Sequence, residues 1–220
     1  NEEPIGDGSC GFLEGYSSSI LWNGEQIRRI PFRNDCNAEA AMVFGIDWLL
    51  NNNNDSKIAS SNLLDFIYEK SEMCKGGRGN PKHPAFGLVA WGGGAPAWLI
   101  ANYGDDSARG LLGTLAAAAS VKSDKWNKYA MRSLIANLRT TGKLGFRTDR
   151  IDMPDLEKNG WRYYYDSAPV SYAPHFEAYL WACNLWAYHK TRYEPFIERT
   201  KIAIRMTMEA YPDQWRWKDS

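Results

Sequence analysis

The sequence predicts an all-α fold built from three αα-hairpins, preceded by a short β-hairpin. Three observations predict it. Six segments have apolar residues at helical spacing. These segments alternate between nearly all-apolar and charged on one side, which is typical of buried and half-exposed helices in turn. Near the start, an Asn-Gly pair lies between two β-prone runs. We find no fixed-period repeat, which weighs against the common solenoid families.

The first expected element is a β-hairpin. The stretch "SILWNGEQIRRI" places Asn23-Gly24 between runs rich in isoleucine, and this dipeptide favours a two-residue turn. Residues 1–33 are therefore predicted to be irregular chain plus this hairpin.

Six helices are predicted after the hairpin. The Gly- and Pro-rich stretch 74–98 is expected to be irregular, and 141–172 is expected to be a long loop. Pro174 suits the first position of the fifth helix. The predicted ranges are about 37–50, 55–72, 105–119, 123–139, 174–189 and 192–210.

The alternation predicts how these helices pack. The first, third and fifth carry few charges, so they are expected to be buried on all sides, and the other three to cover them and face water. A ring or a solenoid of αα-hairpins gives this double layer. We expect one helical domain over 1–220, with the hairpin and lead-in at 1–33 and the helical array at 34–220.

The charges of the inner helices gather at their N-terminal ends. Because inner helices of such an array run parallel, these ends share one rim, and a cleft is expected there. A structural explanation stays open, since an aspartate at a helix start caps free N–H groups and pairs with an arginine three or four residues later. The charged residues are Arg33, Asp35, Glu39, Asp105, Asp106, Arg109, His175 and Glu177.

Composition excludes several functions. With 26 Lys+Arg against 26 Asp+Glu there is no basic field for nucleic acid, and no apolar run approaches the ~20 residues of a membrane span. No phosphate-binding glycine motif or zinc spacing occurs, so neither cofactor nor metal is expected. The four cysteines are expected to be small buried hydrophobic residues, although a Cys10–Cys36 disulfide stays open. The 10 Trp, 12 Tyr and 8 Phe suit a sugar-binding cleft or a core.

Three segments carry a resemblance that covers most of the chain, from about residue 11 to 217. They are "GFLEGYSSSILWNGEQIRRIPFRNDCNAEAAM", "NYGDDSARGLLGTLAAAA" and "YHKTRYEPFIERTKIAIRMTMEAYPDQWRW". They resemble the six-hairpin glycosidase-like proteins of bacterial polysaccharide-degradation systems. The resemblance implies an (α/α)6 toroid with a cleft at one end of its inner helices, and a periplasmic or extracellular location. Three hairpins make half of such a ring, so we expect a partial toroid, completed by the remainder of a larger ring or by another copy.

The resemblance implies a carbohydrate substrate and catalysis by Asp or Glu side chains. The candidates for acid–base catalysis are Asp105, Asp106, Asp35 and Glu14. The candidates for substrate binding are Arg109, Glu39, Trp91, Tyr103, Tyr172, His175 and Glu177.

Three functions stay open at this point. The first is a glycoside hydrolase that uses two carboxyl groups. The second is a polysaccharide lyase on the same fold, with Tyr172 or Tyr103 as base and with His175 and Arg109 near a uronate carboxylate. The third is a non-catalytic helical scaffold that binds glycans.

Overall fold

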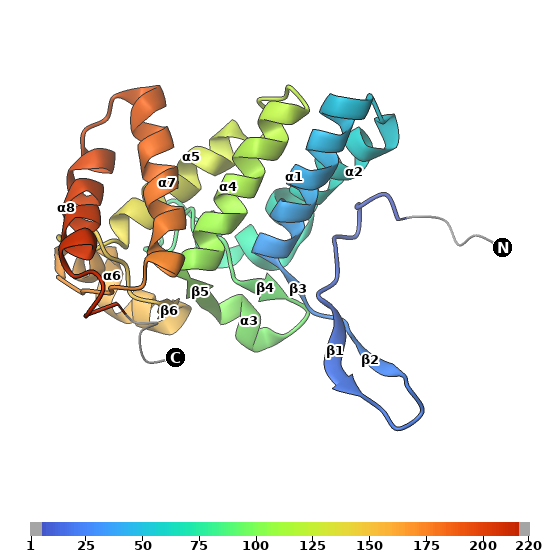
Figure 1. Cartoon of the computed structure of the whole chain (residues 1–220), viewed down its shortest axis with the longest axis horizontal. Coiled ribbons are helices and arrows are strands. Elements are labelled where there is room, and N and C mark those ends of the chain that lie inside the picture. The colour runs from blue at the N-terminus through green and yellow to red at the C-terminus, as the bar shows by residue number, and fades with distance from the viewer. Residues whose placement is uncertain (1–5, 216–220) are drawn as a thin grey trace.

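A computed structural model describes residues 6–215. The protein is mostly helical, with 59% of its residues in helix, and its eight α-helices within this range are accompanied by small antiparallel sheets. The expected β-hairpin is present: β1 (Gly15–Ile20) pairs antiparallel with β2 (Gln26–Arg29). It extends away from the helices in Figure 1. Gly24 has a φ of 86°, which is the positive value that an Asn-Gly turn requires.

Six of the helices form three packed pairs. In each pair the second helix covers the first. Since α1 also packs on α4, and α4 on α7, these three form an inner layer in which they run side by side (Figure 1). The pairs are α1 (Asn34–Asn51) with α2 (Asn54–Asp65), α4 (Gly104–Ser120) with α5 (Asn127–Arg139), and α7 (Pro174–Thr191) with α8 (Pro195–Glu209).

Small residues allow α1 and α4 to pack closely. A Cβ atom on Gly113 would lie 2.7 Å from the carbonyl carbon and oxygen of Ala38. A Cβ on Gly110 would clash with Nδ2 of the Asn34 side chain, also in α1. The glycines in the segment "RGLLGT" therefore let the backbone of α1 approach α4 directly.

Two predicted irregular regions contain regular structure. The expected loop 141–172 holds β6 (Arg150–Asp152) and α6 (Met153–Asp166). Helix α6 was missed because Gly160 has non-helical angles, which interrupts the helical pattern, although Leu156 and Tyr164 are buried as on an amphipathic helix. The Gly- and Pro-rich stretch contains β4 (Gly92–Gly93) and α3 (Pro96–Ile100).

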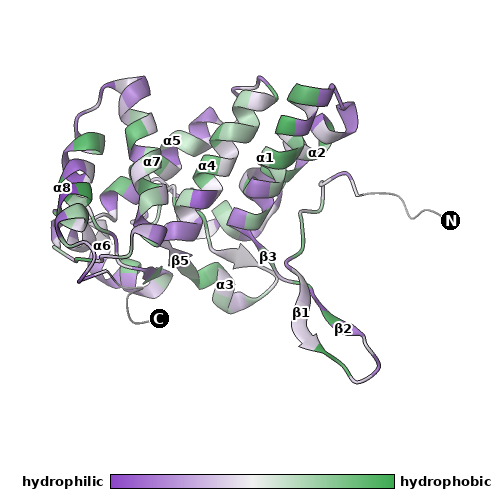
Figure 2. Ribbon diagram, in the orientation of Figure 1, coloured by the Kyte–Doolittle hydropathy of each residue, from purple (hydrophilic) through white to green (hydrophobic). Residues whose placement is uncertain are grey.

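Short strands lead into the inner helices. Strand β3 (Phe32–Arg33) pairs with β4 and runs directly into α1. Strand β5 (Ala101–Tyr103) pairs with β6 and runs directly into α4. These pairings fix the start of each helix against chain that is distant in sequence. Figure 2 shows hydrophilic residues at the corresponding ends of α1, α4 and α7.

The prediction that every inner helix is buried on all sides is wrong for α1 and α7. Each packs on α4 at one side, and their other apolar residues meet solvent because no inner-layer helix among the described residues covers that side. Val43 and Leu50 of α1 are 61% and 72% exposed. Helix α7 exposes Leu185 and Trp186.

All four cysteines are free thiols, so the Cys10–Cys36 disulfide is not formed. Cys183 is buried as expected, whereas Cys10 is exposed because it lies in the irregular lead-in before β1. Between residues 6 and 215 no helix combines the length and the apolar character needed to cross a bilayer.

Candidate functional site

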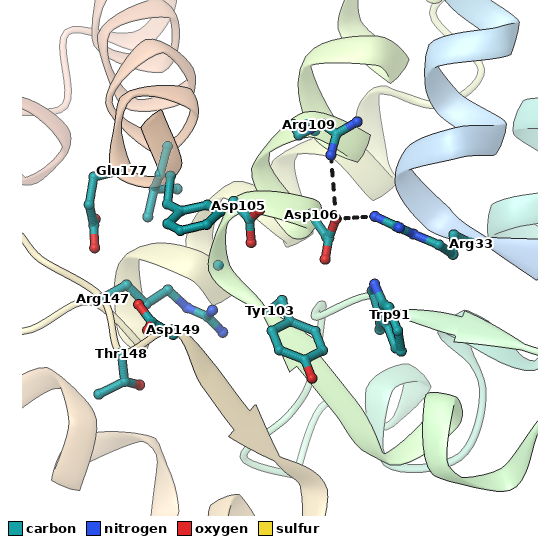
Figure 3. Close-up of a pocket in the computed structure, with 13 residues that line it drawn as sticks. Arg33, Trp91, Tyr103, Asp105, Asp106, Arg109, Arg147, Thr148, Asp149 and Glu177 are labelled. Carbon is teal, nitrogen blue, oxygen red and sulfur yellow. Dashed lines mark hydrogen bonds and ion pairs between the residues drawn. The ribbon is translucent and has the colours of Figure 1, made fainter. Parts of the chain in front are cut away.

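A pocket of about 350 Å³ lies at the N-terminal ends of the inner helices (Figure 3). This is the end at which the sequence predicted a charged cleft. It is lined by Arg33, Trp91, Tyr103, Gly104, Asp105, Asp106, Arg109, Arg147, Thr148, Asp149, Phe176, Glu177 and Leu180.

The strand-to-helix junctions position these side chains. Arg33 ends β3 and Tyr103 ends β5, so both lie immediately before an inner helix. The loop after α5 is attached to the start of α4, because the Gly104 N–H donates to the Asp149 carbonyl oxygen (3.1 Å). The Asn34 N–H donates to the Trp91 carbonyl oxygen (2.9 Å) at the start of α1. Together with the start of α7, the pocket wall is therefore built from five separate parts of the chain.

An acid–arginine network joins α1 and α4 at one side of the pocket. Arg33 Nη2 donates to Asp35 Oδ2 (2.6 Å) and to Asp106 Oδ1 (2.5 Å). Arg109 Nη1 lies 3.2 Å from Asp35 Oδ2 and 3.6 Å from Asp106 Oδ1. Arg109 also donates through Nε (2.9 Å) and Nη2 (2.8 Å) to Glu39. Asp35 is fully buried beneath both guanidinium groups. The network therefore holds Asp106 in a fixed orientation at the pocket.

Asp106 both forms the ion pair expected at the start of a helix and lies at the pocket. The ion pair with Arg109 three residues later is present, and Asp106 also lines the pocket. Burial raises the pKa of Asp106 to about 7, with the negative charges of Asp35 and Asp105 adding to the effect and Arg33 opposing it. Asp106 therefore holds a proton more readily than an exposed aspartate does.

Glu177, in the first turn of α7, is the second buried carboxyl group of the pocket. It is 6% exposed. Burial raises its pKa to about 8, while a hydrogen bond from the Arg147 backbone N–H and the Arg147 charge oppose the rise. Glu177 is therefore largely protonated at pH 7 and can donate a proton.

Arg147 is held rigidly below α4. Its Nε donates to Thr140 Oγ1 (3.1 Å) and its Nη2 donates to Asn102 Oδ1. The residue is 2% exposed, and this burial lowers its pKa to about 10. Arg147 therefore stays charged at neutral pH, although it has lost nearly all of its water.

Aromatic rings form the wall opposite the carboxyl groups. The Trp91 ring lies 4.3 Å from Trp98 and 5.1 Å from Tyr103, measured between ring centroids. The Arg33 guanidinium carbon lies 5.3 Å from the centroid of the Trp91 ring. This packing orients a flat apolar surface with polar edges, which is the kind of surface that sugar rings contact.

The structure brings most of the predicted site residues together. Asp35 and Glu39 belong to the network behind the pocket and do not line it. Six predicted residues line it directly: Trp91, Tyr103, Asp105, Asp106, Arg109 and Glu177.

Three predicted residues lie elsewhere. Tyr172 lines a separate cavity with Arg147, Thr148 and Asp149, and its ring packs on Phe146 at 5.9 Å. His175 is exposed, with its ring 4.2 Å from that of Phe176. Glu14 forms an ion pair with Arg29 (Oε2–Nε, 2.9 Å) beside the β-hairpin. Tyr172, His175 and Glu14 are not among the residues that line the pocket at the ends of the inner helices.

Sequence reasoning missed the contribution of the loop after α5. Arg147, Thr148 and Asp149 line the pocket, yet the run "FRTDR" contains no recognisable motif. Only the pairing of β5 with β6 reveals that this loop reaches the start of α4.

Within residues 6–215, no three or more His, Cys, Asp or Glu side chains are grouped in a way that could hold a metal ion. Comparisons of the chain with models of protein families, with curated proteins and with solved structures gave no match.

Proposed function

We propose that this protein is a glycoside hydrolase, in which the pocket holds a sugar unit and its carboxyl groups cleave the glycosidic bond. The observation that carries the proposal is that Glu177, a carboxyl group only 6% exposed and with a raised pKa, lies with other carboxyl groups in one aromatic-walled pocket. Glycosidases need two carboxyl groups whose environments give them different protonation states.

The roles follow from burial and contacts. Glu177 is the general acid, because its buried carboxyl group keeps a proton that it can give to the leaving oxygen. Asp105 lines the same pocket and lies between Asp106 and Glu177 in Figure 3. It is therefore the group that activates water or attacks the sugar. Arg33 and Arg109 hold one oxygen of Asp106, which leaves its other oxygen to accept from a sugar hydroxyl.

The size and lining of the pocket support a small polar ring as ligand. Its volume of about 350 Å³ is at the lower end of the range for small-molecule sites, roughly 300–1,000 Å³. Trp91, Tyr103 and Phe176 supply apolar contact, while the carboxyl groups and arginines supply hydrogen bonds. The proposed ring packs on the aromatic wall with its scissile bond toward Glu177.

The test is cleavage of a panel of oligosaccharides, measured by the release of reducing ends. For Glu177→Gln we expect a loss of about 100-fold or more on leaving groups that need protonation. Asp105→Asn is expected to lose activity to a similar extent. Glu209→Gln, an exposed exchange of the same type on α8, is the matched control and should keep full activity. Full activity in both pocket variants, or cleavage of no glycan, would refute the proposal.

A second candidate is a lyase that acts on uronate sugars. It is favoured by the buried Arg147 guanidinium, which could stabilise a uronate carboxylate while Tyr103 in the same pocket removes the α-proton. Elimination leaves an unsaturated sugar that absorbs ultraviolet light, whereas hydrolysis does not. Products that absorb ultraviolet light and whose total mass has not increased by one water molecule would favour the lyase.

A further inference from the structure

The pocket contains a buried cationic group whose hydrogen bonds are incomplete. Arg147 uses Nε and Nη2 on the neutral oxygens of Thr140 and Asn102. Its Nη1 is buried and has no hydrogen-bond partner among residues 6–215. In contrast, Arg33 and Arg109 of the same pocket are both paired with carboxylates. A buried guanidinium nitrogen without an acceptor is costly, and a ligand anion is the natural group to complete it.

A glycine lies directly against Nη1. Gly104, which also lines the pocket, begins α4. A Cβ atom at this position would lie 3.2 Å from Arg147 Nη1. Any residue other than glycine would therefore place a methyl or larger group against this nitrogen.

A second buried donor is unused in the same pocket. Trp91 Nε1 has no hydrogen-bond partner among the described residues, and Trp91 lines the pocket. Two separate donors without acceptors indicate a ligand that carries acceptors at more than one position. An acidic sugar has this pattern, with a carboxylate and several hydroxyl groups on one ring.

We propose that the pocket is selective for a uronic acid unit, whose carboxylate accepts a hydrogen bond from Arg147 Nη1. This inference rests on the proposed function, since it names the substrate class of the same site. Trp91 Nε1 donates to one of the hydroxyl groups of this sugar unit.

The surrounding charges favour a ligand with one negative charge. Asp105 and Asp149 also line the pocket and repel a dianion such as a phosphate monoester, which carries about −1.5 to −2 at pH 7. A carboxylate carries one charge and is therefore repelled less strongly. A sulfate ester also carries one charge, and the experiment separates these two sources.

The first test is isothermal titration of the full chain with disaccharides of glucuronic, galacturonic and mannuronic acid. Each acid is compared with three counterparts. They are its methyl ester, the matching disaccharide without the carboxyl group, and that neutral disaccharide with one sulfate ester added. We expect at least one uronic disaccharide to bind tenfold or more tightly than its three counterparts. Equal binding of acid and methyl ester, or tighter binding of the sulfated sugar, would overturn the proposal.

A second test uses a variant that keeps Arg147 in place. Gly104→Ala puts one methyl group beside Nη1, and Gly104 does not have the positive φ that would strain alanine. We expect the ratio of acid to ester affinity to fall fivefold or more, while the circular dichroism spectrum stays unchanged. Gly6→Ala is the control, because its Cβ would meet nothing within 4 Å. A ratio unchanged by Gly104→Ala would contradict the role of Nη1.

The outcomes separate this inference from the proposed function. Selective binding of a uronic disaccharide with no cleavage of any glycan would refute the hydrolase proposal and support the uronate site. Cleavage of neutral and acidic glycans with equal efficiency would support the hydrolase proposal and refute the uronate site.

Discussion

Replacing Glu177 with glutamine should remove a large pH dependence from the stability of the fold. The pKa of Glu177 rises from an ordinary 4.5 to about 8 because the carboxyl group is buried. Between these values the folded protein keeps a proton that the unfolded chain releases, so stability falls as pH rises. Each pH unit in that window costs about 1.4 kcal/mol, so the full effect of this group is on the order of 5 kcal/mol.

Urea unfolding of the wild type and Glu177→Gln at pH 5 and at pH 8.5 measures this difference. Glutamine keeps an oxygen that can accept from the Arg147 backbone N–H and has nearly the same volume. We expect similar stabilities at pH 5, and Glu177→Gln more stable than the wild type by several kcal/mol at pH 8.5. Equal stabilities at both values would refute the assignment of a protonated Glu177. Glu209→Gln on the surface of α8 is the matched control.

Three further predictions test the packing, the ion pairs and the cysteines. Gly113→Ala should lower the free energy of unfolding by about 1–3 kcal/mol, because its Cβ would lie 2.7 Å from the Ala38 carbonyl; a variant as stable as the wild type in urea would contradict the close packing of α1 on α4. Arg33→Met should cost about 3 kcal/mol because it leaves Asp35 buried without that partner, whereas Arg150→Met, whose exposed guanidinium bonds Asp152, should cost less than about 1 kcal/mol; equal losses in thermal unfolding would argue against the network. Cys10 should react with a thiol reagent in the folded protein, while Cys183, whose pKa burial raises to about 12, should react only after unfolding; equal rates would show that the packing of α7 on α4 does not shield Cys183.

The helices of the inner and outer layers could be predicted because their apolar residues follow a helical period. The ranges found for α4 and α7 differ from the predicted ones by at most two residues at each end. Helix α6 could not be found in this way, because Gly160 breaks its regular angles. Burial on all sides was predicted wrongly for α1 and α7, since composition reports that a helix is apolar and not which neighbour covers it.

The candidate site was predicted in part for a physical reason. Parallel inner helices bring their first turns to one rim, and this argument correctly gathered Asp105, Asp106 and Glu177 at one pocket. The family resemblance implied a catalytic role for Asp35, whereas the structure buries it completely beneath two arginines. Arg147 was missed because a β-bridge between distant segments brings its loop to α4, and local sequence does not encode such pairings.

Product analysis in water enriched in oxygen-18 tests the central claim most directly. The protein is incubated with uronate and neutral oligosaccharides, and the products are examined by mass spectrometry. If Glu177 protonates the leaving oxygen, each cleavage adds one labelled oxygen to a new reducing end, and Glu177→Gln abolishes that label. Unsaturated products without the label, or no cleavage of any glycan, would contradict the account.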